Sequence, residues 1–136
     1  MPSTIFSFND FEKFVFQQVA VLERYKADRS AKLSILFLRL EGAETDQVCR
    51  LLEGSLRQSD AIFTKDEYYF LVLPNTDKEG ALHIINVLQD FFKKEIPEVI
   101  ITYPEEASSS KEMLEKLVYY AKEEWWIELG DVITPY

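Results

Sequence analysis

The sequence is poor in cysteine, and this scarcity bounds both its chemistry and its location. Cys49 is the only cysteine among 136 residues, so no disulfide bond can form within the chain. Structural disulfides belong to oxidising compartments, and the opening decapeptide MPSTIFSFND lacks the basic region of a secretory signal. No apolar run reaches the roughly 18 residues that a membrane-spanning helix needs. We therefore expect a cytoplasmic protein that does not insert into membranes.

Positive charge is also scarce. Lys and Arg total 15 against 24 Asp and Glu, which gives a net charge of −9 at neutral pH. Binding to nucleic acid or to an anionic membrane needs a cationic face, so we expect neither partner. His83 has no Cys or His at metal-ligand spacing, and Cys49 has Arg50 as its only basic neighbour in the sequence. We expect no metal, no cofactor and no reactive thiol.

Apolar residues are plentiful, at 47% of the chain with 14% aromatic, which is ample for the core of one domain over residues 1–136. The clearest local pattern is a β-hairpin. Ala61–Thr64 and Tyr68–Leu73 are rich in β-branched, aromatic and aliphatic residues, and only Lys65-Asp66-Glu67 separates them. Two such runs with so short a polar break are typical of antiparallel strands joined by a tight turn.

Hydrophobic periodicity and helix caps predict the remaining elements, the caps being Thr45 and the first residues of the capping-box pairs Asn9/Glu12, Thr76/Glu79 and Ser109/Glu112. The predicted helices are Asn9–Lys26, Thr45–Gln58, Thr76–Phe92 and Ser109–Glu124, and the predicted strands besides the hairpin are Leu33–Leu40, Val99–Thr102 and Trp125–Ile133. The middle of this order is strand, helix, strand, strand, helix, strand. We therefore predict an α+β fold with a ferredoxin-like βαββαβ core, an antiparallel sheet with helices on one face. An N-terminal helix and a C-terminal helix and strand are added to it.

Two parts of this fold carry further expectations. Leu33–Leu40 is nearly continuously apolar, which is typical of a central strand covered on both faces. The first helix carries Phe14, Phe16, Val21 and Tyr25 in addition to the apolar stripe that faces the core. Such an excess of apolar surface indicates an interface, so we expect this helix to self-associate or to dock on a protein partner.

The hairpin region resembles the signature of GGDEF domains, the diguanylate cyclase family. The family pattern Arg-x-x-Asp, five residues, GGDEF is matched by Arg57, Asp60 and then Asp66–Phe70, or by Lys65–Tyr69 in a register shifted by one residue. Ile101–Pro104, ITYP, resembles the family's S-x-G strand, and Leu117–Glu124, LVYYAKEE, resembles its A-L-Y-x-A-K helix. Asn9 lies in a helix start similar to L-x-N-R-x-x-F. The resemblance implies a nucleotidyl cyclase-like sandwich.

Departures from the family pattern imply that the chain is not an enzyme. Arg39-Leu40-Glu41 stands where the family has the D-x-D whose leading aspartate binds magnesium. Side chains replace both turn glycines in either register, and the segment between Glu41 and Arg57 is too short for the family's guanine-binding stretch. Glu41, Asp66 and Glu67 can still form a carboxylate cluster, but acidic residues are common in solvated turns, and we favour that interpretation.

Arg57 and Asp60 are the candidate ligand-binding residues, because the resemblance places them at the family's inhibitory site for cyclic di-GMP. A guanidinium can bond O6 and N7 of guanine together. Alternatively, Arg57 favours a helix C-terminus and Asp60 favours a turn. We expect a degenerate, catalytically inactive GGDEF-like module of bacterial signal transduction that acts through protein–protein interaction. The alternative function is a cyclic di-GMP receptor.

Overall fold

The computed structural model describes residues 3–24, 31–57 and 59–133. These residues form five strands and four α-helices, with one turn of 3₁₀ helix at Phe8–Asp10. In chain order these are β1 (Ser3–Ser7), α1 (Phe11–Arg24), β2 (Leu33–Arg39), α2 (Thr45–Glu53), β3 (Asp60–Lys65), β4 (Tyr68–Pro74), α3 (Lys78–Phe92), β5 (Glu98–Tyr103) and α4 (Ser110–Trp125).

The five strands form one sheet in the order β1-β3-β4-β2-β5. Strand β2 pairs antiparallel with both β4 and β5, and β3 pairs antiparallel with β4. The segment from β2 to β5 is therefore a βαββαβ unit with an antiparallel sheet, as the element order predicts. Strand β2 has a neighbour on each side, which confirms the interior position expected for Leu33–Leu40. Strand β1 was not predicted, and its backbone extends the sheet by pairing parallel to β3.

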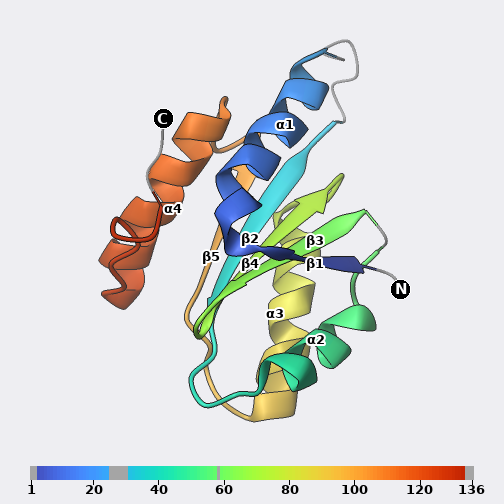
Figure 1. The fold of residues 1–136 in the computed structure, drawn as a ribbon, viewed down its shortest axis with the longest axis vertical. Helices are drawn as coiled ribbons and strands as arrows, with labels where there is room; N and C mark the ends of the chain where they lie inside the picture. Colours follow the sequence, from blue (N-terminus) through green and yellow to red (C-terminus); the bar gives the residue numbers. More distant parts are fainter. Residues whose placement is uncertain (1–2, 25–30, 58, 134–136) are drawn as a thin grey trace.

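Both faces of the sheet are covered, as the apolar run in β2 requires. Leu33, Ile35 and Phe37 belong to a core cluster with α1 and α4, whereas Leu36 and Leu38 belong to a second cluster with α2 and α3. Figure 1 shows these two helix pairs on opposite sides of the strands. The two helices of the βαββαβ unit share one face, as predicted, and the two added helices cover the other.

The hairpin confirms the pattern that predicted it. Lys65 pairs with Tyr68, so the turn itself consists of Asp66 and Glu67 alone. Asp66 has φ 55°, a left-handed conformation that favours glycine but that aspartate tolerates better than most residues. The polar break in the sequence therefore lies at the tip of the hairpin.

Helix starts agree only partly with the predicted caps. Ser109 caps α4 by accepting a hydrogen bond from the Glu112 backbone N–H at 3.1 Å, as its spacing predicts. The cap of α3 is Asp77, which accepts from Gly80 N, and not Thr76. Thr45 is the first residue of α2, and the N-cap is Glu44 without a side-chain bond. Thr76 fails as a cap because its hydroxyl bonds to the carbonyl of Pro74.

The predicted strand at Trp125–Ile133 is wrong. Trp125 ends α4, and the residues after it fold back on the first core cluster through Ile127, Leu129 and Ile133. The Trp125 indole N–H donates to the Glu98 carbonyl at 2.7 Å on the outer edge of β5. This side chain occupies a backbone acceptor that another strand would need.

The first helix is shorter than predicted, beginning at Phe11 and ending at Arg24, and Lys26 lies outside the described residues. Phe11, Val15 and Val19 are buried, and Phe14 packs partly on the core with its ring 5.4 Å from that of Phe63. Phe16 and Val21 are 64% and 52% exposed, so they form the apolar surface that the excess predicted. Tyr25 also lies outside the described residues. None of the described helices is long and apolar enough to cross a bilayer.

Candidate functional site

The candidate residues of the sequence fall at two opposite ends of the sheet. Arg57 and Asp60 lie where β3 begins and β4 ends, whereas Arg39 and the hairpin turn lie where β2 ends. The length of β3 from Asp60 to Lys65 separates the two ends by roughly 17 Å, at about 3.3 Å per residue. We describe them in turn as the Arg57 end and the turn end.

At the Arg57 end, the structure brings Arg57 and Asp60 together. The Arg57 backbone N–H donates to Asp60 Oδ2 at 2.8 Å, and Arg57 Nη2 lies 3.7 Å from Asp60 Oδ1. Arg57 Nη2 also donates to the Pro74 carbonyl at 2.5 Å and to the Thr76 hydroxyl. The guanidinium therefore ties the segment before β3 to the end of β4.

Asp60 is buried, with 4% of its surface exposed. Burial raises the pKa of its carboxyl, and the backbone bond and the charge of Arg57 oppose that rise. Oδ1 has no hydrogen-bond partner within the described part of the chain. Asp60 thus depends on Arg57 for most of the stabilisation of its negative charge.

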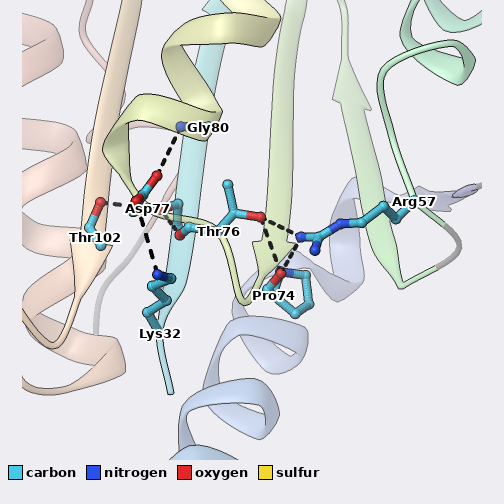
Figure 2. Close-up of polar contacts among 8 residues, drawn as sticks. Lys32, Arg57, Pro74, Thr76, Asp77, Gly80 and Thr102 are labelled. Atoms are coloured by element: carbon cyan, nitrogen blue, oxygen red, sulfur yellow. Dashed lines mark hydrogen bonds and ion pairs between the residues drawn. The ribbon is translucent and has the colours of Figure 1, made fainter. Parts of the chain in front are cut away.

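A cleft of about 320 Å³ opens beside this pair and is lined by Arg57, Asp60, Lys32, Asp77 and His83, among others. Figure 2 shows the polar network around it, with Arg57 reaching Pro74 and Thr76 from across the strand end. Behind Thr76, the buried Ser34 hydroxyl donates to the Thr76 carbonyl at 2.6 Å and lies 3.1 Å from the Thr102 hydroxyl.

The sequence singled out Arg57 and Asp60 but missed the residues that hold them. In sequence, Pro74 is typical of a strand end, Thr76 of a helix cap, and Ser34 is one residue in an apolar run. The only available signal for Ser34 was a small hydroxyl within LSILFLRL, which interrupts an otherwise apolar strand. Such a residue in a covered strand needs a hydrogen-bond partner, and here it has two.

At the turn end, β2 and the hairpin turn are neighbours, as expected. Leu40 N donates to the Glu67 carbonyl at 2.9 Å, and Arg39 pairs with Tyr68 across β2 and β4. Arg39 Nε is buried and lies 3.9 Å from Glu41 Oε1, without a hydrogen-bond partner in the described residues. The carboxylate cluster considered for Glu41, Asp66 and Glu67 does not form, because no group of three or more potential metal ligands gathers anywhere within residues 3–24, 31–57 and 59–133.

The architecture is similar to that of a solved structure. The crystal structure of a DGC protein from Thermotoga maritima, DGC being the abbreviation of diguanylate cyclase, superposes with a TM-score of 0.65. The match covers 88% of this chain and 94% of the other, at 16% sequence identity. The fold is GGDEF-like.

That likeness is visible in three dimensions and not in sequence profiles. No family model matches the chain, and no curated protein matches it. At 16% identity the likeness establishes the GGDEF-like fold, and any function must be argued from the residues at the two ends of the sheet.

Of the other titratable side chains, Cys49 and Tyr69 are buried on the α2 side of the sheet, and His83 lies at the Arg57 end. Cys49 is buried, and burial together with the neighbouring Asp46 raises the pKa of its thiol, which opposes formation of the nucleophilic thiolate. His83 is an exposed residue on α3 at the rim of the cleft. Tyr69 is buried on the α2 side, where its hydroxyl lies 3.4 Å from that of Thr45.

Proposed function

We propose that this chain is a catalytically inactive GGDEF-like module of bacterial signal transduction that acts through contact with another protein chain. The first support is the signature itself. With the hairpin turn at Asp66 and Glu67, the register that aligns Asp66–Phe70 with GGDEF places both glycine positions in the turn. The same register keeps Arg57 and Asp60 in line with the family's Arg-x-x-Asp.

The observation that carries the proposal is the pairing of Arg39 with Tyr68. In family cyclases, an aspartate at the end of the first strand and an acidic residue of the signature hold magnesium. In this register Arg39 stands in for the aspartate and Tyr68 for the signature acid. A guanidinium repels a divalent cation, and a neutral phenol is a poor ligand for magnesium, which prefers carboxylate oxygens. The residues present do not fit the metal, so we derive no catalytic step through it.

The turn opposes nucleotide binding in a second way. Glycines in the family turn let the backbone approach the nucleotide closely. Here Asp66 and Glu67 place two carboxylates at that position, and a triphosphate would meet negative charge without a metal to neutralise it. In addition, α2 has only nine residues and the whole connection from Glu41 to Arg57 is short.

The proposed contact with another chain rests on α1. Single exposed apolar residues are ordinary on a soluble protein, whereas a patch of them usually marks a contact surface. Phe16 and Val21 are exposed by 64% and 52% on a helix whose other face already buries Phe11, Val15 and Val19. These two side chains add nothing to the core, and they are available to a partner or to a second copy.

A turnover assay tests the inactivity. Purified protein with GTP and either magnesium or manganese should form no cyclic di-GMP above a control without protein, and an active cyclase assayed in parallel shows that the conditions are permissive. Multiple turnovers by the purified chain would overturn the proposal.

The second candidate function is a cyclic di-GMP receptor, which the cleft beside Arg57 and Asp60 favours. Against it, Arg57 Nη2 is already bonded to Pro74 and Thr76, and the net charge of −9 repels a dianionic dinucleotide. We expect weak or absent binding that weakens further as salt rises. Calorimetric titration of wild type and Arg57→Ala decides: tight binding lost in Arg57→Ala supports a receptor, and tight binding that survives it excludes this site.

A further inference from the structure

Trp126 is an exposed residue in a position where a large side chain does nothing for the fold. Its backbone N–H bonds to the Lys122 carbonyl, and Ile127 N bonds to the Ala121 carbonyl at 3.0 Å. The first of these is the single bond of the αL motif, which ends a helix with one residue in the left-handed conformation. Glycine is favoured there, yet this chain has tryptophan at φ 59° with 90% of its surface exposed.

The surroundings of Trp126 are acidic. Glu123, Glu124, Glu128 and Asp131 are all exposed in the sequence around it, and the one cation nearby, Lys122, lies 3.5 Å from Glu128. An exposed indole in an acidic stretch of chain fits a partner surface that offers an apolar groove with positive charge at its rim. Buried tryptophan is among the commonest anchors of protein interfaces.

The same chain contains such a groove at the other end of α4. A groove of about 570 Å³ lies between the first turns of α1 and α4, with Phe16 and Leu114 among its apolar lining. Lys13 and Lys111 line it from either helix and are exposed, and the half-buried Glu12 is the one acidic residue of the lining, so the charged residues of the groove sum to +1. Its volume falls in the range of sites that enclose small aromatic molecules, so it has room for an indole ring.

We propose that Trp126 of one copy inserts between α1 and α4 of a second copy, with its carboxylates facing Lys13 and Lys111. This inference rests on the proposed function as an interaction module and identifies the two surfaces that meet. The Trp126 side chain (the knob) and the groove lie at opposite ends of α4, which spans roughly 24 Å for its 16 residues. The contact is therefore heterologous, and copies add head to tail unless a ring closes.

Two variants separate the two halves of the contact. Trp126→Gly removes the knob at a site where glycine suits the backbone, and Lys13→Glu with Lys111→Glu reverses the charge of the groove. In analytical ultracentrifugation, wild-type protein should increase in average mass with concentration, and salt should reduce this increase. Each variant alone should weaken association by roughly tenfold or more, the effect of losing an interface anchor. Trp126→Gly should retain or raise the melting temperature.

Mixing gives the decisive result. The Trp126→Gly chain keeps an intact groove and the lysine-reversed chain keeps its knob, so each retains one half of the contact. The mixture should therefore form 1:1 pairs and nothing larger, because the intact groove of the Trp126→Gly chain can take the intact Trp126 of the lysine-reversed chain. As a charge-matched control, Arg50→Glu with Lys93→Glu makes the same charge change on the α2–α3 side and should associate like wild type.

Three results would overturn the inference: monomeric wild type at all concentrations, unchanged association of Trp126→Gly, or a mixture without pairs. The proposed function fails separately. Val21 does not line the groove, so loss of association in Val21→Asp together with unchanged association in Trp126→Gly would assign the interface to the exposed side of α1 and exclude the groove. Formation of cyclic di-GMP would instead reject the proposed inactivity and leave the contact standing.

Discussion

Arg39 and Tyr68 are directly opposite each other in neighbouring antiparallel strands, so their side chains leave the same face of the sheet. The Tyr68 ring lies 5.5 Å from that of Phe37, two residues before Arg39 in β2. The guanidinium of Arg39 has Glu41 as its ion-pair partner at 3.9 Å. A strand end with this pair carries a positive charge at the point where a metal-dependent cyclase would need a negative one.

This pairing predicts how the turn end responds to divalent cations. Replacing both residues with carboxylates, Arg39→Asp and Tyr68→Glu, should create a weak manganese site, because two carboxylates across neighbouring strands are within reach of one ion. Thermal melts should then show a manganese-dependent rise for the variant and none for wild type. The matched control is Arg39→Asn with Tyr68→Gln, which lacks charge. An equal manganese shift in wild type would contradict our interpretation of this end.

Loss of the Arg57 guanidinium should destabilise the fold through the groups that it leaves behind. Arg57→Ala removes the bonds to Pro74 and Thr76 and leaves Asp60 buried without its cation. We expect a loss of about 1–2 kcal/mol, since hydrogen bonds are worth roughly 1 kcal/mol each and Arg57 is half exposed. Urea unfolding of wild type and variant measures it, and a difference within error would show that the network adds no stability.

The stability deficit of the same variant should depend on pH. Burial raises the folded pKa of Asp60 above its unfolded value of about 3.9, so the folded state holds the proton more tightly. Stability therefore falls as pH rises from the unfolded pKa through the folded one. Without Arg57 the folded pKa rises further, and the deficit of Arg57→Ala should grow between acidic and neutral pH. In an Asp60→Asn background that growth should disappear, and its persistence would point to another group.

The pattern of apolar and polar residues predicted those elements whose burial in the fold matches that pattern. Alternating and continuous apolar runs located β2, β3 and β4, and the short polar break located the turn. Trp125–Ile133 failed because apolar residues at close spacing are common to a strand and to a tail that packs on a core. The deciding feature was the left-handed Trp126, and no pattern predicts that conformation at a tryptophan. Similarly, Arg57 and Asp60 were identifiable in sequence. The roles of Pro74 and Thr76 depend on the pairing of β4 with β3, which brings the end of β4 beside Arg57.

The exposed residues of α1 predict a defect in association and not in folding. Phe16→Asp with Val21→Asp should lower self-association or partner binding and leave the free energy of unfolding within about 0.5 kcal/mol, as is usual for surface positions. Light scattering and urea unfolding measure the two quantities. Phe91→Asp is the matched control, because Phe91 is 49% exposed and lies on α3 across the sheet. Unchanged mass and unchanged partner binding in the α1 variant would remove α1 from the interface.

The contact between α1 and the edge strand β5 should weaken in alkali. The Tyr103 hydroxyl donates to Glu23 Oε1 at 2.6 Å, and this bond joins the last turn of α1 to the end of β5. Burial, together with the bond to Glu23 and its charge, raises the pKa of Tyr103 to about 12. An unfolded tyrosine titrates at about 10, so between these values the folded state binds the proton that the unfolded state releases. The stability from this contact is therefore complete below about pH 10 and is lost as pH rises towards 12.

Tyr103→Phe should be less stable than wild type by roughly 1 kcal/mol at neutral pH, the usual worth of such a bond, and the difference should shrink as pH rises above 10. Glu23→Gln separates the causes, because it retains an acceptor but removes the charge, and it should lower the pKa of Tyr103. Parallel curves of stability against pH for wild type and Tyr103→Phe would show that Tyr103 titrates at its ordinary value and that the bond to Glu23 does not hold in solution.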